Sequence, residues 1–166
     1  MRGAGRLSGP AEGSVNGTTY RAARAVVLAT GTKVNVPPIK GLDQVPYWTN
    51  REAVKTVELP KSLVVLGGGA VGLEFAQVFA RFGVAVTVVE ALPRLLATEE
   101  HEVGELVTPI LTQEVIVVRN CTRATGVTRP GSPIVLQTEG GRRGDGARPP
   151  VAAALRADTK LGGGAT

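Results

Sequence analysis

The clearest pattern in the chain is an apolar run followed by glycines and then by helical periodicity. The run covers residues 63–66, a glycine-rich stretch follows it, and a second apolar run covers residues 84–89. Short β-branched runs on either side of an amphipathic helix predict two buried parallel strands joined by a crossover helix. We expect that helix over residues 70–82, ending at Gly83, with an apolar face formed by Val71, Phe75, Val78, Phe79 and Phe82.

The glycines between the strand and the helix have the spacing of a dinucleotide-binding turn. They read Gly67-Gly68-Gly69-Ala70-Val71-Gly72. Gly67 would permit the tight turn, Gly69 would let a diphosphate approach the backbone, and Gly72 would let the helix pack closely on the strand. The first N–H groups of the helix would face the diphosphate. The pattern predicts a dinucleotide pocket, and the alternative is an ordinary βαβ crossover that binds nothing.

Glu90 determines which cofactor we expect, because it ends the second strand, 18 residues beyond Gly72. A carboxylate at this place accepts hydrogen bonds from the adenosine ribose hydroxyls and repels a 2′-phosphate. The sequence therefore favours NAD over NADP, and Arg94 lies close enough to weaken that preference.

Shorter patterns predict the elements before this unit. Asn16-Gly17 is a typical hairpin turn within the glycine-rich residues 1–20. Residues 24–30 read as a buried strand that ends at Gly31, and the proline-punctuated residues 32–48 read as an extended linker. Asn50 would cap a short helix.

After the unit we expect a helix from residue 99 or 100 to 113, with a break or kink at Pro109. Strand candidates follow at residues 115–118, 122–127 and 133–138. From residue 140 the chain is rich in Gly, Arg and Pro, and its composition predicts disorder.

Composition limits the classes of function. The 166 residues suit one domain with attached pieces, and 43% hydrophobic residues can build a core. The net charge of +5 comes from the two ends, since residues 25–138 balance ten Lys/Arg against ten Asp/Glu. We therefore expect no nucleic-acid partner. No membrane partner is expected either, and without an apolar leader we expect a cytoplasmic protein.

The residues that could do redox or metal chemistry are few. The chain has one cysteine, Cys121, and one histidine, His101, so neither a disulfide framework nor a metal site is expected. We interpret Cys121 as a buried or half-buried structural thiol and His101 as a surface residue. The absence of a Tyr-x-x-x-Lys pair argues against a short-chain dehydrogenase, and Gly72 argues against a methyltransferase.

Two motifs together resemble the FAD-dependent pyridine nucleotide-disulfide oxidoreductases, with dihydrolipoamide dehydrogenase and mercuric reductase as the most similar members. One motif is the glycine turn with Glu74 and Glu90. The other is the segment 25–31, which ends in Ala29-Thr30-Gly31 and lies 36 residues before Gly67. The resemblance covers about residues 15–138 and implies the central NAD-binding segment of such an enzyme.

The resemblance implies roles for individual residues. Glu74 would lie toward the nicotinamide and the flavin, although as an acid in the first turn of the helix it could equally complement the helix dipole. Ala124 would line the adenine side of the pocket. Ala29, Thr30 and Gly31 would contact a flavin if the rest of a flavin site were present.

Other family landmarks have no match in the chain. These are the N-terminal FAD fingerprint, the cysteine pair and the His-Glu dimerisation domain through which family members form homodimers. We therefore expect an NAD(H)-binding domain that is incomplete and not catalytic alone, with FAD not retained. A stand-alone dinucleotide-binding module and a nonfunctional truncated product are the alternatives.

The expected fold is α/β, with a Rossmann-like parallel sheet built around the βαβ unit and a small β-meander. We divide the chain into a remnant of a FAD-binding domain over residues 1–40, an NAD-binding domain over 41–139, and a disordered tail over 140–166.

Overall fold

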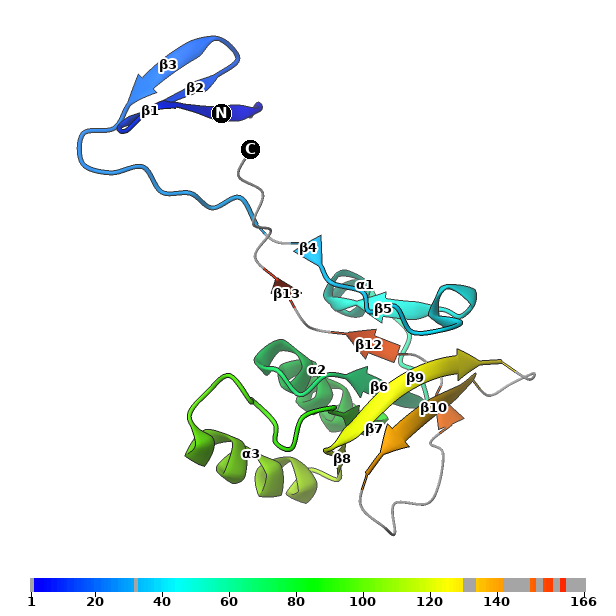
Figure 1. Cartoon of the computed structure of the whole chain (residues 1–166). Helices are drawn as coiled ribbons and strands as arrows, with labels where there is room; N and C mark the ends of the chain where they lie inside the picture. Colours follow the sequence, from blue (N-terminus) through cyan, green and yellow to red (C-terminus); the bar gives the residue numbers. More distant parts are fainter. Residues whose placement is uncertain are drawn as a thin grey trace. The chain divides into compact units, whose positions relative to one another are not determined.

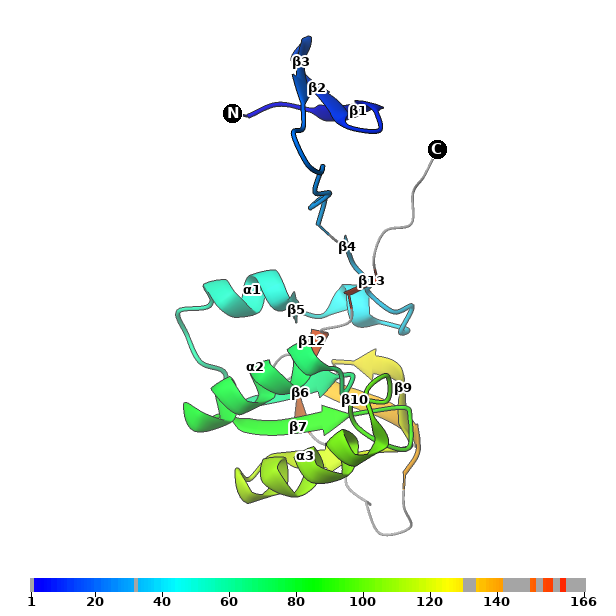
Figure 2. The same cartoon turned by 90° about the vertical axis from the view of Figure 1, so that its left-hand side faces the viewer.

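In the computed structural model of the chain, the described residues are 2–31, 33–129, 134–141, 150–151, 154–156 and 159–160 (Figures 1 and 2). They fall into two compact units, residues 1–32 and residues 33–166. Unit 1 is a small antiparallel sheet, and unit 2 is an α/β domain.

Unit 1 contains the predicted hairpin. Strands β1 (Gly5–Gly9), β2 (Glu12–Val15) and β3 (Thr18–Arg21) pair antiparallel in the order β1-β2-β3. Asn16 and Gly17 have φ of 51° and 80°, and two positive φ angles are what a tight turn with the twist of the strands requires. The prediction at Asn16-Gly17 is confirmed.

The strand predicted at residues 24–30 is not formed. These residues have no regular secondary structure, and Val27 and Leu28 are 85% and 66% exposed. A strand needs a neighbour for its N–H and C=O groups, and no described strand pairs with this segment. The segment is apolar and β-branched, but this composition forms a strand only where a neighbouring strand pairs with it.

Unit 2 is built on a parallel sheet with the order β5-β12-β6-β7-β8. The bounds are Tyr47–Thr49 for β5, Ala154–Arg156 for β12, Ser62–Leu66 for β6, Ala85–Val89 for β7 and Val117–Arg119 for β8. Helix α2 (Ala70–Arg81) joins β6 to β7, and α3 (His101–Gln113) precedes β8. The predicted α/β fold with a parallel βαβ unit is confirmed.

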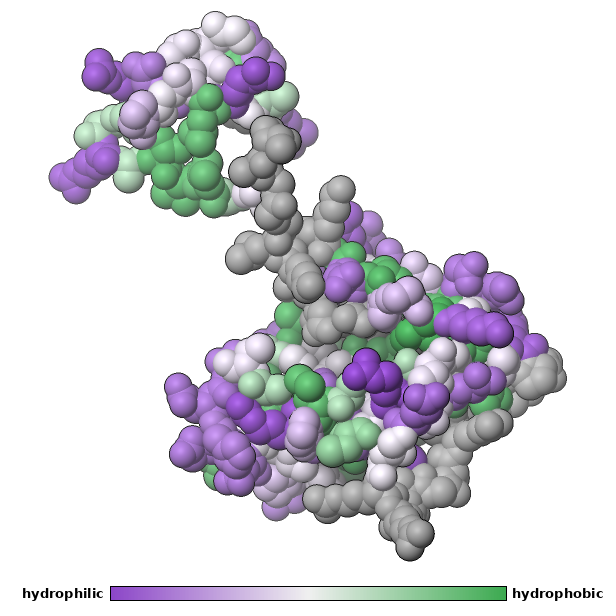
Figure 3. All heavy atoms as spheres, in the orientation of Figure 1, coloured by the Kyte–Doolittle hydropathy of each residue, from purple (hydrophilic) through white to green (hydrophobic). Residues whose placement is uncertain are grey.

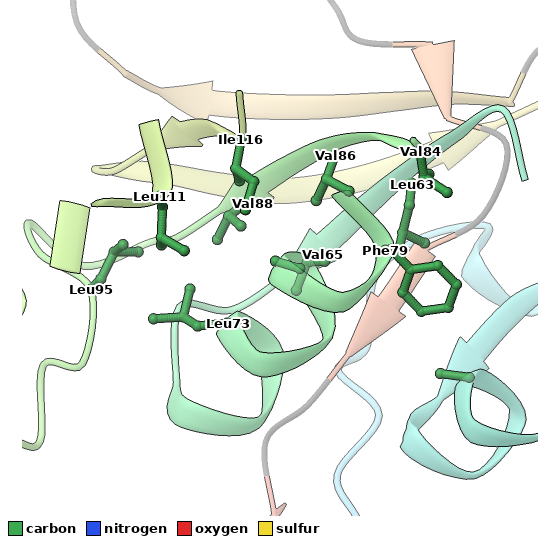
Figure 4. Packing of buried hydrophobic residues seen from close by; sticks show 12 residues of the cluster. Leu63, Val65, Leu73, Phe79, Val84, Val86, Val88, Leu95, Leu111 and Ile116 are labelled. Atoms are coloured by element: carbon green, nitrogen blue, oxygen red, sulfur yellow. The ribbon is translucent and has the colours of Figure 1, made fainter. Parts of the chain in front are cut away.

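The sheet has one apolar cluster on each face, because strand side chains alternate. Leu63 and Val65 of β6 belong to the cluster that includes Phe79 of α2 and Leu111 of α3 (Figure 4). Val64 and Leu66 belong to the second cluster, which also contains Leu42, Val45, Val89, Val127, Ile134 and Leu136. Burial on both faces explains why β6 reads as a continuous apolar run.

Helix α2 packs on the sheet through only part of the predicted face, in which Phe79 is buried and Phe75 packs against the core cluster. Its buried residues are Gly72, Leu73, Ala76 and Phe79, whereas Val78 and Phe82 are 47% and 67% exposed. Small residues let the helix axis approach the strands closely, so Gly72 and Ala76 lie at the contact together with Leu73 and Phe79.

Helix α3 runs from residue 101 to 113 with Pro109 inside it, so of the predicted break or kink the break is wrong, and a kink stays a prediction. Glu102 lies in the first turn, where an acid complements the helix dipole. Leu111 is 1% exposed in the cluster beneath the helix. Tertiary packing of this kind holds the helix across a residue that cannot donate the hydrogen bond.

The three later strand predictions are correct in type. The first becomes β8 of the parallel sheet, and the others become β9 (Thr122–Thr128) and β10 (Ile134–Gly140), an antiparallel pair. The small antiparallel part of the expected fold is therefore this pair, extended at one edge by β11 (Pro150–Val151).

Part of the segment predicted as a linker belongs to the domain. After β4 (Lys33–Val34) comes the 3₁₀ helix η1 (Leu42–Gln44), whose Leu42 is 4% exposed. The Val127 N–H donates to the Lys40 carbonyl at 2.7 Å, and Gly41 has φ of 79° and leaves no room for a Cβ beside the Val127 carbonyl. The segment is thus fastened to β9.

The short helix α1 (Asn50–Lys55) begins one residue earlier than predicted, with Thr49 as its N-cap. Thr49 and Glu52 form a reciprocal capping box. Trp48, just before it, packs on Phe79 with ring centroids 6.0 Å apart.

Secondary structure also occurs within residues 140–166, where disorder was expected. Besides β11, this span supplies β12 to the parallel sheet and β13 (Thr159–Lys160), which pairs with β4. The expectation is wrong for these strands, because pairing with neighbours forms strands that two or three residues of sequence cannot reveal. The remaining residues of the span lie outside the described ones.

Candidate dinucleotide-binding site

A cavity of about 220 Å³ lies where β6 and β7 end and β9 begins. In an open parallel sheet, ligands bind outside the carboxyl ends of the strands. The cavity is therefore in the expected place. Its lining consists of Pro37, Ile39, Leu66, Gly67, Val89, Glu90, Ala91, Thr122, Arg123 and Ala124.

The glycine turn connects this cavity to the start of α2. Gly67 has φ of 105°, as expected for the tight turn, and its N–H donates to the Val89 carbonyl at 2.9 Å. Gly69 is the N-cap of α2, and no side chain caps the helix there. Ala70, Val71 and Gly72 form its first turn. Their N–H groups have no acceptor within the helix, so this end of α2 suits an anion.

Gly68 has a role that the sequence reasoning did not assign. It is buried, and a Cβ built on it would lie 2.5 Å from Leu95 Cδ2 and 3.3 Å from Glu90 Oε2. Gly68 thus lets a leucine side chain and the predicted ribose acid both approach the turn.

Glu90 follows β7 directly and is fixed by hydrogen bonds at both its backbone and its side chain. Its Oε2 accepts from the Gly68 N–H at 2.6 Å, and its Oε1 accepts from the Leu92 N–H at 2.7 Å. The backbone N–H donates to the Arg119 carbonyl at 2.8 Å. A carboxylate has about four acceptor sites, so each oxygen retains acceptor capacity for a further donor such as a hydroxyl.

Ala124 lines the same cavity as Glu90, and its place beside the adenine stays a prediction. The cavity also includes Thr122 and Arg123 from β9 and Pro37 and Ile39 from the segment read as a linker. Sequence reasoning missed these four residues. The closeness of Thr122 and Arg123 to Ala124 was an available signal, whereas the docking of residues 37–39 left none.

Glu74 is exposed on α2 and is not among the residues that line the cavity. It lies beyond the first turn of the helix, which contains no acid. The reading of Glu74 as a first-turn acid is therefore wrong, and its role toward a nicotinamide stays a prediction.

Arg94 is not positioned as a free cation beside the cavity. Its Nη1 and Nη2 donate to backbone carbonyls of the loop that follows it, among them Leu96 and Ala97, both at 2.9 Å. A guanidinium engaged in this way does not offer its fork to a 2′-phosphate, so the expectation that Arg94 weakens the preference for NAD loses its basis.

Ala29, Thr30 and Gly31 lie in unit 1 and are exposed. Ala29 and Thr30 line a groove of about 700 Å³ that the same unit forms with Leu7, Val15 and Tyr20. Figure 3 shows hydrophobic residues gathered on this unit. Residues 2–31 include no helix, so they offer no helix N-terminus for the diphosphate of a flavin dinucleotide.

The remaining candidates are on the surface. Cys121 is exposed, which contradicts the expected buried or half-buried thiol. Its φ is 52°, and its backbone forms hydrogen bonds with Leu92 and Gly141. His101 is on the surface as predicted, 3.4 Å from Glu105.

The described residues offer neither a metal centre nor a membrane span. Among them, no cluster of three His, Cys, Asp or Glu side chains could hold a metal ion. Nor does any helix in that part of the chain have the length and apolar character needed to cross a membrane.

A profile of the pyridine nucleotide-disulphide oxidoreductases matches residues 1–163. The chain belongs to this family. The resemblance inferred from the glycine turn, Glu90 and the segment 25–31 is thereby confirmed.

Curated relatives point to the same family. The chain is 44% identical over 116 residues to a mercuric reductase from Shewanella putrefaciens, covering 70% of this chain and 21% of that protein. It is 39% identical over 131 residues to a dihydrolipoyl dehydrogenase from Thermus scotoductus, covering 76% and 27%. The chain thus spans about a fifth to a quarter of the length of these relatives.

Solved structures agree on the fold. The HOCl-induced flavoprotein disulfide reductase RclA from Escherichia coli, in its Cu(II) complex, matches with a TM-score of 0.72 and 24% identity. The match covers 98% of this chain and 36% of that one. An engineered water-forming NADPH oxidase bound to NADPH matches with a TM-score of 0.64 and 16% identity, covering 88% and 33%.

Proposed function

We propose that this chain binds NAD(H) at the glycine turn and the cavity beside it. In this proposal the N–H groups at the start of α2 hold the diphosphate, and Glu90 accepts hydrogen bonds from the adenosine ribose. Ala124 contributes to the wall beside the adenine.

The observation that carries the proposal is the placement of Glu90. Its carboxylate lines the cavity and also accepts the Gly68 N–H of the turn at 2.6 Å. The ribose and the diphosphate belong to one nucleotide, so the residues that bind them must lie close together. The hydrogen bond from Gly68 keeps the Glu90 carboxylate next to the glycine turn. The second Glu90 hydrogen bond, from Leu92, fixes the carboxylate before any ligand binds.

The cofactor preference follows from charge. A 2′-phosphate would approach a carboxylate that is already fixed, and like charges that close repel each other. Arg94, which could have offset this repulsion, donates to backbone carbonyls instead. We therefore propose that the chain binds NAD(H) more tightly than NADP(H).

Within an oxidoreductase of this family, such a domain would position NAD(H) for hydride transfer to FAD, and the flavin would accept the hydride. Residues 2–31 do not fit a flavin dinucleotide, since they lack a helix to face its diphosphate. We therefore propose NAD(H), and not FAD, as the dinucleotide that this chain binds.

Titration of the purified chain with NAD⁺ and NADP⁺ in a calorimeter tests the proposal. We expect wild type to bind NAD⁺ more tightly than NADP⁺. Glu90→Ala should weaken NAD⁺ binding by about tenfold or more, since hydrogen bonds to a charged group are worth about 1.5–3 kcal/mol. It should also bring the two affinities closer together.

Glu58→Ala is the matched control, because it removes an exposed carboxylate outside the cavity. It changes the net charge as much as Glu90→Ala does, and it should leave the preference for NAD⁺ unchanged. Equal affinity of wild type for the two nucleotides, unaltered in Glu90→Ala, would overturn the proposal for Glu90.

A further inference from the structure

The guanidinium of Arg94 organises the loop that follows it. Nη1 donates to the carbonyls of Leu96 at 2.9 Å and Glu100 at 3.4 Å. Nη2 donates to the carbonyls of Ala97 at 2.9 Å and Glu99 at 2.8 Å. One side chain thus gathers four carbonyls from a five-residue stretch that contains no regular secondary structure before α3.

This loop is attached to the glycine turn at two points. The Leu96 N–H donates to the Gly68 carbonyl at 2.8 Å. The Leu95 side chain is fully buried, and its Cδ2 lies 2.5 Å from the position that a Cβ of Gly68 would take. Leu95 lies with Leu73 and Leu111 in the core cluster beneath the helices (Figure 4). A displacement of the loop would therefore displace Gly68, through the Leu96 hydrogen bond and through the Leu95 side chain.

Helix α3 closes over the same loop. A Cβ on Gly104 would lie 2.6 Å from the Leu95 carbonyl oxygen and 3.3 Å from Nη1 of Arg94. The missing side chain of Gly104 lets the helix pack directly on the Arg94 network. The half-buried Arg94 side chain and its hydrogen bonds therefore lie against α3.

We propose that Arg94 is a positioning residue for the glycine turn: by fixing residues 96–100 it sets the place of Gly68, and through Gly68 the places of Glu90 and the α2 N-terminus. It does so without touching the cofactor. The part of this inference that concerns cofactor affinity rests on the proposed NAD(H) binding, whereas the part that concerns the Gly68 contact does not.

Lysine cannot replace arginine here. The guanidinium is planar and donates from two terminal nitrogens in a fixed fork, and each of the two reaches a different pair of carbonyls. An ammonium has three donors on one atom, so it cannot reach both pairs with good geometry. Arg94→Lys keeps the charge and removes the fork, which isolates the positioning effect.

The test compares Arg94→Lys with Arg81→Lys in the full chain. Arg81 is the matched control, because its guanidinium also makes a forked contact, to Glu114, away from the cavity. Amide hydrogen exchange measured by NMR reports the Leu96 N–H, which is the donor to Gly68. Calorimetry gives the dissociation constants for NAD⁺ and NADP⁺.

For Arg94→Lys we expect Leu96 exchange to be faster by about tenfold, and both dissociation constants to rise by a common factor of about ten. Arg81→Lys should leave the Leu96 exchange rate and the affinities within about twofold of wild type. A loss confined to NADP⁺ would overturn the proposal, because it would mean direct contact with the 2′-phosphate. Unchanged Leu96 exchange in Arg94→Lys, or an equal change in Arg81→Lys, would overturn it too.

If wild type binds neither nucleotide, the proposed function fails. The exchange rate of Leu96 then decides the positioning role alone, so the two failures are distinguishable.

Discussion

The Gly68 N–H donates to Glu90 Oε2 at 2.6 Å, joining two residues 22 positions apart in the sequence. This contact links the turn after β6 to the acid after β7. The parallel pairing of the two strands, Leu66 beside Val89, brings these residues together. The arrangement of the site is therefore a direct consequence of the register of the sheet.

Gly68→Ala tests how closely the turn is packed. A Cβ there would lie 2.5 Å from Leu95 Cδ2, so the buried leucine must shift. We expect a loss of about 1–3 kcal/mol in the free energy of unfolding, measured by urea denaturation, and weaker NAD⁺ binding. Gly5→Ala is the control, since the nearest atom to its Cβ is 4.0 Å away. If Gly68→Ala were as stable as wild type, the turn would not be closely packed against Leu95.

The glycine turn shows what the sequence could predict. The glycine spacing predicted the turn, because its backbone conformation is one that few residue types adopt, and the two apolar runs predicted both strands. The contacts of Gly68 with Leu95 and of Arg94 with the loop carbonyls could not be foreseen. They depend on the path of residues 91–100, which has no periodicity.

Helix α2 and residues 24–30 show what the sequence could not predict, namely which side chains are buried. In both, apolar residues were identified correctly, but their surroundings were not. Phe82 is exposed because the helix packs through Gly72 and Ala76, and Val27 is exposed because no described strand pairs with its segment. Local composition predicts an element, and its neighbours decide which face is buried.

Pro109→Ala should stabilise the domain. Pro109 is exposed within α3, so the substitution loses little packing and restores the N–H that the Glu105 carbonyl lacks. Proline inside a helix costs roughly 3 kcal/mol relative to alanine, and we expect a gain of up to about this size in thermal or urea unfolding. A less stable variant would mean that the helix depends on the proline ring.

Acid should weaken the link between α2 and α3. The hydrogen bond from Arg81 is the largest cause that lowers the pKa of Glu114 below 4.5, its ordinary value. A lowered folded-state pKa contributes stability above 4.5 and loses it as the pH falls through the folded-state pKa. Glu52 in the capping box has a lowered pKa for a similar reason, the hydrogen bond from Thr49.

Glu114→Gln isolates this effect. We expect its unfolding temperature to be lower than that of wild type at neutral pH, and to fall less steeply as the pH drops below 4.5. The control is Glu58→Gln, which changes an exposed carboxylate outside the Arg81 contact. Identical pH profiles for wild type and Glu114→Gln would exclude the ion pair as a source of acid sensitivity.

In the proposed site, the main-chain amides after β6 hold a dinucleotide diphosphate. The direct measurement is a ¹H–¹⁵N NMR titration of the full chain with NAD⁺, following the amides of Gly67 to Gly72. We predict saturable shifts that are largest at Gly69, Ala70 and Val71, with smaller shifts at Glu90 and Ala124 and none in residues 5–21. Shifts that spare the glycine turn, or no shifts at millimolar NAD⁺, would contradict the account.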